Sequence, residues 1–136
     1  MSCPFVLFNP HPHGLLVDDC VKRSIVAVTG MDYMEVQRQL NRYKKVTGAK
    51  CFNSNYNPHC YVENVLGGIK MICYPDESGK RPTVAEFAAA HPIGHFILDV
   101  KGHWTALMDG VIRDTWNPSE REVYVAWRVF YKGGNE

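Results

Sequence analysis

Apolar residues in the first part of the chain recur at the spacing of a helix face. Three of them stand at intervals of four and three residues, which is typical of an amphipathic helix: Val21, Ile25 and Val28. The pattern predicts a helix over residues 19–29, with Asp18 or Asp19 as its N-cap and Gly30 as its end. The prolines of segment 9–14 exclude a helix there and predict an extended arm that leads to it.

A second amphipathic helix is predicted between Asp32, which caps it, and Gly48, which ends it. Its apolar face is formed by Met34, Val36, Leu40 and Tyr43. Its other face is basic and carries Arg38, Arg42, Lys44 and Lys45. One face of this helix is therefore expected in the core and the other in solvent.

The middle of the chain contains many turn-forming residues. Between Cys51 and His59 these residues predict an exposed loop. Three elements are expected after it: a short helix over 61–66, a strand over 69–74 and a helix over 84–91. Thr83 is the predicted cap of the last helix, and Pro92 stops it.

The C-terminal part is rich in β-branched and aromatic residues, which favour strands. Four strand segments are predicted, separated by turn residues: 96–101, 103–108, 111–116 and 122–131. Asp109-Gly110 is the strongest hairpin signal in the chain, and a two-residue turn there places Met108 opposite Val111. Because side chains alternate between the faces of a strand, His103 and Asp114 become diagonal neighbours, within reach of a hydrogen bond.

Cys20, at the start of the first helix, and His103, at the start of a strand, form the candidate catalytic pair. A thiol at a helix N-terminus is poised to ionise, and an imidazole serves as its base if the two elements pack together. Asp114 is expected to orient the imidazole, and Trp116 to shield that hydrogen bond from water. Asp19 stands beside the thiol, where its charge opposes thiolate formation, and its expected role is helix capping.

The order Cys20, His103 and Asp114-Thr115-Trp116 resembles the papain-like cysteine peptidase superfamily. In that superfamily a Cys begins the first main helix, a His lies on a later strand, and an Asn or Asp on the next strand precedes a Trp by two residues. An Asp in third place is similar to the small C39-type peptidases. Three further motifs resemble small papain-like proteins of phages and prophages, and the likeness covers most of the chain: Asn9-Pro10-x-Pro12-x-Gly14, Asp19-Cys20-Val21-x-Arg23 and Thr83-Val84-x-Glu86-Phe87.

This resemblance implies an α+β fold in which N-terminal helices pack on a C-terminal antiparallel β-sheet. It also implies a Cys-His-Asp triad that works through a thioester acyl-enzyme. In papain a Gln six residues before the nucleophile donates to the oxyanion, and that position is Gly14 here. The backbone amide of Cys20 supplies one donor, and the arm offers Asn9 or His13 as the second. Asn9 is the expected donor because an amide always carries N–H groups.

Composition and charge narrow the classes of function. The chain has 136 residues and suits one domain over 1–136, with an extended arm (1–17), a mainly helical half (18–91) and a β-sheet half (92–136). Lys and Arg number 15 against 14 Asp and Glu, without blocks of like charge, which argues against nucleic acid as a partner. The start of the chain has no basic leader, and no apolar run reaches membrane-spanning length. We therefore expect no membrane association and a cytoplasmic location, in the host cell if the chain is phage-encoded.

Cysteine and histidine usage argues against cross-links and metals. The five cysteines are an odd number without a close pair, so a disulfide framework is not expected. The remaining candidates for zinc ligands lack the paired spacing of a zinc site: His11, His13, His59 and Cys60. No metal and no cofactor are expected. Arg23 is expected to pair with Asp18 or Asp19 at helical spacing, or else to bind a substrate carboxylate.

Two functions from different classes follow. The first is a cysteine hydrolase, a peptidase, isopeptidase or amidase, that acts on a protein or peptide substrate. The same residues would equally serve acyl transfer to an amine. The alternative is a catalytically weak or inactive papain-like scaffold that binds or inhibits a host protein, with the Asn-rich loop 51–59 and the basic face of the second helix as its contact surface.

Overall fold

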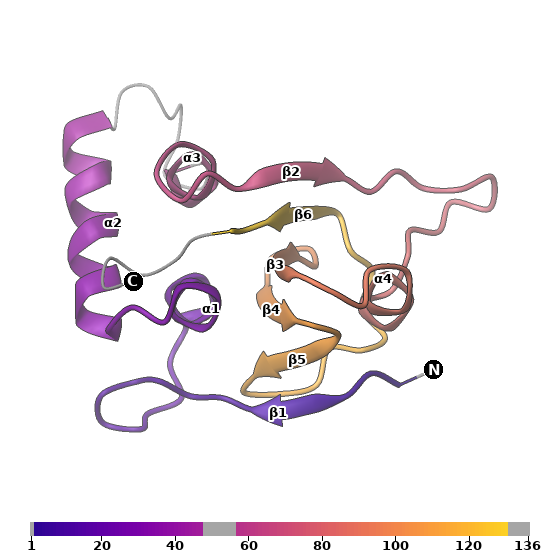
Figure 1. Ribbon diagram of the computed structural model, residues 1–136, viewed down its shortest axis with the longest axis horizontal. Helices are drawn as coiled ribbons and strands as arrows, with labels where there is room; N and C mark the ends of the chain where they lie inside the picture. Colours follow the sequence, from indigo (N-terminus) through magenta and orange to yellow (C-terminus); the bar gives the residue numbers. More distant parts are fainter. Residues whose placement is uncertain (1, 48–56, 131–136) are drawn as a thin grey trace.

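The computed structural model describes residues 2–47 and 57–130 (Figure 1), which form an α+β fold. The helices are α1 (Cys20–Thr29), α2 (Tyr33–Thr47), α3 (Asn57–Asn64) and α4 (Val84–Ala90). The strands are β1 (Phe5–Leu7), β2 (Ile69–Ile72), β3 (His95–Asp99), β4 (Trp104–Met108), β5 (Val111–Asp114) and β6 (Val125–Arg128). The α+β class predicted from the sequence is confirmed.

The strands form one sheet in the order β1-β5-β4-β3-β6-β2. Strand β1 runs parallel to β5, and the other neighbours are antiparallel. The sheet is therefore mixed. The predicted antiparallel arrangement holds for β2 to β6, and the strand predicted over 69–74 is present as β2, but the parallel edge strand β1 was not predicted. Strand β1 has only three residues, too few to show a period of two, and only its pairing with β5 defines it.

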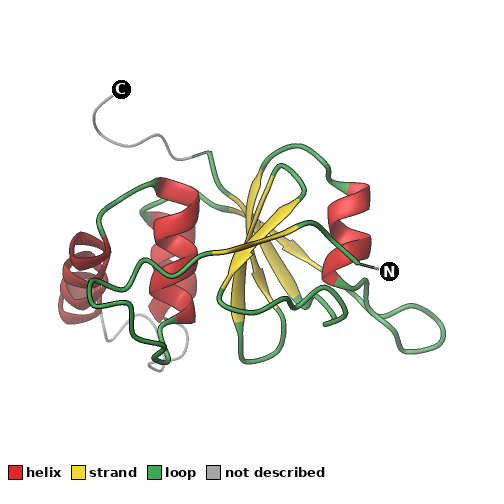
Figure 2. Cartoon of the chain, turned by 90° about the horizontal axis from the view of Figure 1, so that it is seen from below, coloured by secondary structure: helices red, strands yellow, loops and turns green. Residues whose placement is uncertain are grey.

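Helices cover both faces of the sheet. Figures 1 and 2 show α1 on one face, with α2 and α3 on the same side, and α4 on the opposite face. A hydrophobic core lies on each face of the sheet, and strand β3 contributes to both. Ile97 packs in the core beneath α1, while Phe96 and Leu98 pack in the core beneath α4. A strand buried on both faces has an apolar run without alternation, as these residues do.

The predicted helix ends are mostly confirmed. Gly30 ends α1 in a left-handed conformation with φ 73°, and its N–H donates to the Val26 carbonyl. Asp32 caps α2, because its Oδ2 accepts from the backbone N–H groups of Met34 and Glu35. Thr83 and Glu86 form a reciprocal capping box at the start of α4.

Helix α3 begins at Asn57, four residues before the predicted start at Tyr61, and ends at Asn64. The predicted loop between Cys51 and His59 is therefore wrong at its end, while residues 51–56 lie outside the described part of the chain. Pro58 suggested a loop, yet a proline is tolerated in the first turn of a helix, where its missing N–H has no partner to lose.

The hairpin between β4 and β5 has the predicted turn and register. Asp109 and Gly110 both have positive φ, 49° and 80°, as a type I′ turn requires. Met108 pairs with Val111 and Ala106 pairs with Arg113. The register therefore brings the end of β5, Asp114, alongside the start of β4.

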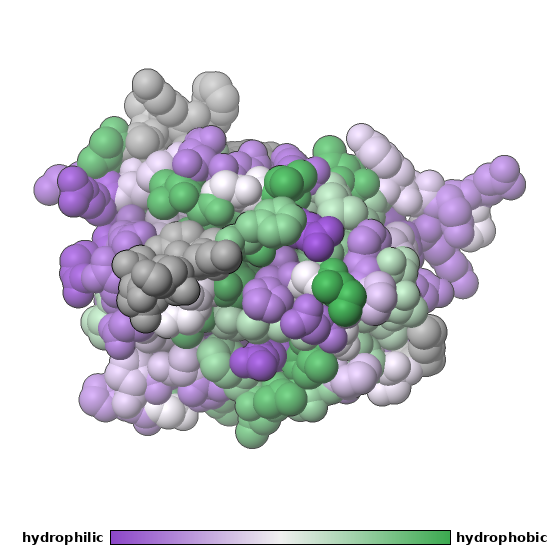
Figure 3. Space-filling view, in the orientation of Figure 1, coloured by the Kyte–Doolittle hydropathy of each residue, from purple (hydrophilic) through white to green (hydrophobic). Residues whose placement is uncertain are grey.

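Figure 3 shows hydrophobic residues in several separate patches on this face of the molecule. Both edge strands carry exposed apolar side chains, Val6 and Leu7 on β1 and Ile69 and Ile72 on β2. Both edge strands are short, which limits pairing with a strand of another chain. None of the helices within the described residues combines the length and the apolar character needed to span a membrane.

Candidate active site

Cys20 is the first residue of α1 and is half-buried. Its neighbour Asp19 has non-helical dihedrals, φ −128° and ψ 25°, so the helix begins at the cysteine itself. The first N–H groups of a helix have no partner within the helix and carry the positive end of its dipole. This location favours negative charge on the Cys20 sulfur or on an oxygen bound beside it.

His103 directly precedes β4, at the end of a tight turn from β3. Lys101 and Gly102 occupy the turn with positive φ of 66° and 82°, and the N–H of Val100 donates to the His103 carbonyl at 2.8 Å. The short turn fixes the backbone of His103 at the start of the inner strand β4, against which α1 packs. The first helix and the strand after His103 are thus packed together, as the catalytic interpretation required.

Asp114, the last residue of β5, binds the ring of His103. The distance from His103 Nε2 to Asp114 Oδ2 is 2.8 Å, and Asp114 has no exposed surface. The other oxygen, Oδ1, accepts from the backbone N–H of Thr115 at 2.6 Å. The carboxylate is therefore anchored by the chain on one side and orients the imidazole on the other, as the hairpin register predicted.

His103 also interacts with the side chain of Cys20, which contributes to raising the pKa of the imidazole. Because Asp114 engages Nε2, Nδ1 is the ring nitrogen left to face the sulfur. Burial lowers the pKa of His103, but hydrogen bonds and the charges of Asp114 and Cys20 outweigh burial and raise this pKa to about 9. Burial would raise the pKa of Asp114, but the hydrogen bond from His103 and its charge keep that pKa below its ordinary value. The imidazole is thus protonated at neutral pH.

Trp116 lies against the His103 ring, with the ring centroids 4.7 Å apart and the planes inclined by 39°. The guanidinium of Arg121 lies over the indole at 5.3 Å. Trp116 remains 39% exposed, so it covers one side of the imidazole and does not seal it. The predicted contact between these two side chains is present.

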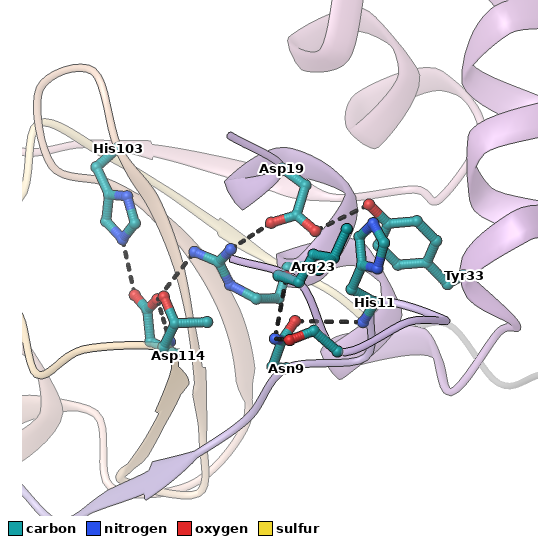
Figure 4. Close-up of polar contacts among 10 residues, drawn as sticks. Asn9, His11, Asp19, Arg23, Tyr33, His103 and Asp114 are labelled. Carbon is teal, nitrogen blue, oxygen red and sulfur yellow. Dashed lines mark hydrogen bonds and ion pairs between the residues drawn. The ribbon is translucent and has the colours of Figure 1, made fainter. Parts of the chain in front are cut away.

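Asp19 has a role that the sequence did not predict. It occupies the N-cap position of α1, but its side chain makes no capping hydrogen bond. Instead Oδ1 accepts from Arg23 Nη1 at 2.5 Å and Oδ2 accepts from the Tyr33 hydroxyl at 2.8 Å (Figure 4). The capping prediction is wrong because a charge-assisted bond to a buried guanidinium is stronger than a bond to a neutral N–H.

Arg23 pairs with Asp19 as predicted, and it also reaches across to the site. Its Nη2 donates to Asp114 Oδ1 at 3.0 Å, a contact between residues 91 positions apart that sequence reasoning missed. The signal was present in α1, where Arg23 is the first of seven consecutive buried residues. A charged residue on a helix that is buried all round requires a buried counter-ion.

Asn9 lies on the arm, but its amide is used within the arm. Both Nδ2 hydrogens donate to backbone carbonyls, of Gly14 at 3.2 Å and Leu15 at 3.1 Å. Its Oδ1 accepts from the N–H of His11 (Figure 4). In this conformation the side chain of Asn9 is bonded to the backbone of the arm and is not the oxyanion donor that was expected. Short polar side chains readily form such bonds with nearby backbone groups. His13, the other candidate, is exposed.

Two grooves lie next to each other on this side of α1, and Cys20 lines one of them. One, of about 520 Å³, runs between the start of α1 and α2 and is lined by Asp18, Asp19, Cys20, Val21, Lys22, Gln37, Leu40 and Asn41. The second, of about 470 Å³, lies between α2 and the arm. Lys22 and Gln37 line both, and the Lys22 ammonium donates to Gln37 Oε1 at 2.8 Å. A ligand in the first groove lies against Cys20.

The remaining candidates from the sequence do not join this site. Across residues 2–47 and 57–130, no three His, Cys, Asp or Glu side chains gather as a metal site would require. The cysteines of this part of the chain, Cys3, Cys20, Cys60 and Cys73, form no disulfide with one another. Comparison of the chain with protein-family models, with curated proteins and with solved structures gives no match.

Proposed function

We propose that the protein is a cysteine hydrolase that cleaves an amide bond, in a peptide, an isopeptide or a related substrate. One observation carries the proposal: a thiol at the start of α1 interacts with an imidazole whose Nε2 is held by a buried carboxylate. Nucleophile, base and orienting acid are the three roles of covalent amide hydrolysis.

The chemistry proceeds in two halves. The Cys20 sulfur attacks the carbonyl carbon, and the C=O electron pair moves to the oxygen, which faces the N–H groups at the start of α1. When the carbonyl re-forms, the C–N bond breaks and His103 gives its proton to the leaving amine. Water then attacks the thioester while His103 takes up a proton, and the acid product leaves Cys20 as it began. An amine in place of water gives acyl transfer by the same steps.

The pKa of about 9 for His103 suits this sequence, because the imidazole carries the proton that the leaving amine needs. Asp114 fixes the ring with Nδ1 towards the sulfur and stabilises the imidazolium. The groove between α1 and α2 is the proposed substrate site, since it opens beside Cys20 and has the volume of a small ligand or a few residues of peptide.

A papain-like fold is proposed with this function. It is supported by the chain order of the site, with the cysteine on the first helix, the histidine before a later strand and the aspartate on the next one. The contact between His103 and Trp116 supports it as well.

Acylation by p-nitrophenyl acetate tests the function. We expect a burst of about one nitrophenolate per chain, with the acetyl group found on Cys20 by peptide mass mapping and lost again by hydrolysis. Cys20→Ala is expected to abolish the burst. Cys60→Ala is the matched control, because Cys60 is another half-buried thiol on a helix, and it is expected to retain the full burst.

Acetyl groups spread over several thiols, or a burst that survives Cys20→Ala, would contradict the hydrolase. That result would instead favour the alternative in which the scaffold binds a protein without turning it over. If the burst depends on Cys20, peptide libraries are incubated with the wild type and with Cys20→Ala. The bond that only the wild type cleaves identifies the substrate.

A further inference from the structure

Arg23 joins two carboxylates in the interior beside the proposed catalytic residues (Figure 4). Its guanidinium donates to Asp114 through Nη2 and to Asp19 through Nη1. Arg23 is 4% exposed, Asp19 is 4% exposed and Asp114 is fully buried. All four carboxylate oxygens accept hydrogen bonds, the other donors being His103, Thr115 and Tyr33.

We propose that Arg23 is the positioning residue of this site, which holds Asp114 ionised and fixed behind His103 and compensates the charge of Asp19 beside the thiol. This inference rests on the proposed hydrolase function and names a further residue that the chemistry requires. Arg23 acts through Asp114 and Asp19 and does not itself take part in the reaction of the thiol.

The balance of buried charge supports this role. Asp19 and Asp114 contribute two negative charges, and Arg23 and the His103 imidazolium contribute two positive ones. Without the guanidinium, two buried carboxylates face one cation, and such pairs take up a proton at a higher pH than a lone carboxyl. A protonated Asp114 no longer stabilises the imidazolium. His103 would then lose its positive charge and Cys20 its negative charge.

The elements around Asp114 supply few other charges. His103 faces it from the turn before β4 and Arg23 faces it from α1, with Asp19 beyond Arg23 and Cys20 beyond His103. Strand β1, which pairs with β5, leads to the backbone N–H of Phe8, which donates to the Asp114 carbonyl. Arg23 is therefore the permanent cation of the cluster, since His103 is able to lose its proton.

The shape of the guanidinium also matters. Its planar fork presents two nitrogens to two carboxylates at once, and a lysine ammonium is a single point charge on a flexible stem. Arg23→Lys keeps the charge and is expected to hold one carboxylate at the expense of the other. Arg23→Gln removes the charge, and Asp19→Asn in that background removes the repulsion that results.

The test is the ratio of Cys20 alkylation rates by iodoacetamide at pH 6 and pH 8. This ratio reports the charge state of the site and is insensitive to a uniform loss of folded chain. We expect Arg23→Gln to lower the ratio severalfold, by at most about sixfold for each unit by which the pKa of the thiol rises. Arg23→Lys should lower it less, and Asp19→Asn combined with Arg23→Gln should restore part of it. Arg38→Gln is the matched control, because Arg38 pairs with Glu35 on the exposed face of α2.

A second readout does not depend on thiol reactivity. In the Cys20→Ala chain, the carboxyl carbon resonance of Asp114, assigned by its loss in Asp114→Asn, should titrate at a higher pH when Arg23 is replaced by Gln or Lys. Equal titration with and without Arg23, or alkylation slowed equally at both pH values, would overturn the positioning role. An unreactive Cys20 in the wild type counts against the hydrolase alone, and the resonance then decides the role of Arg23. If Arg23→Gln does not fold, Arg23→Lys carries both measurements.

Discussion

Two of the histidine–carboxylate pairs formed with residues of this sheet behave in opposite ways. His103 binds Asp114 at 2.8 Å, and its pKa is raised to about 9. His59, on α3, lies 3.9 Å from Asp99 at the end of β3, and its pKa is lowered. Burial acts on both imidazoles in the same direction, so the difference must come from their partners.

The partners differ in how firmly they are held. Asp114 is fully buried and its second oxygen is fixed by Arg23 and Thr115. Asp99 is partly exposed, while the ring of His59 packs against the indoles of Trp127 and Trp104, with centroids 4.8 Å and 5.4 Å away. For His59 the loss of hydration outweighs the attraction of Asp99. The pKa of His103 is raised by a close, buried carboxylate together with Cys20, whereas the more distant Asp99 does not offset the burial of His59.

The largest expected difference between the pairs is in stability. Asp114→Asn removes the negative charge that pairs with the buried guanidinium of Arg23 and with the imidazolium. Removing one partner of a buried ion pair lowers the free energy of unfolding by about 3–5 kcal/mol. Asp99→Asn alters a partly exposed pair and should cost less than about 1 kcal/mol. Urea unfolding at pH 7 measures both. Equal losses for the two variants would show that the anchoring of Asp114 does not distinguish the pairs.

A smaller effect, with opposite signs, is expected in the pH dependence of stability. The pKa of His103 is raised from 6.5 to about 9 by folding, so its contribution is fully present below pH 6.5 and is lost as the pH rises through about 9. The pKa of His59 is lowered, so its contribution is present above pH 6.5 and declines as the pH falls through the lowered pKa.

Replacing each histidine by glutamine isolates these contributions. The stability gap between wild type and His103→Gln should narrow from pH 6 to pH 9.5, while the gap for His59→Gln should narrow from pH 7.5 to pH 5. Unfolding midpoints across this range provide the test. Gaps that change in the same direction for both histidines would contradict the assigned pKa directions.

Much of the site was predictable because it is encoded locally. The Asp109-Gly110 turn fixes the register of β4 and β5, and the register alone brings Asp114 to His103. The start of α1 at Cys20 follows from helical spacing and from Gly30 at the other end. These inferences need only a turn type and a period, which short stretches of sequence carry.

The remaining features depend on contacts between distant segments. Arg23 meets Asp114 across 91 positions, and no local pattern indicates which acid a buried arginine will find. Asp19 was predicted to cap α1 because local rules favour that role, and Tyr33 and Arg23 override them. Strand β1 was missed for the same reason, since its partner β5 lies a hundred residues away in the chain.

The central claim is that His103 activates Cys20, and the pH dependence of Cys20 alkylation by iodoacetamide tests it most directly. Wild type, His103→Gln and His59→Gln are compared, with every thiol followed by peptide mass mapping. An ordinary thiol with a pKa of about 8.5 is less than about 1% ionised at pH 6. We expect Cys20 of the wild type to react rapidly there, about 100-fold faster than in His103→Gln. His59→Gln should leave the rate unchanged. A Cys20 that reacts no faster than Cys60, or that is indifferent to His103, would contradict the catalytic pair.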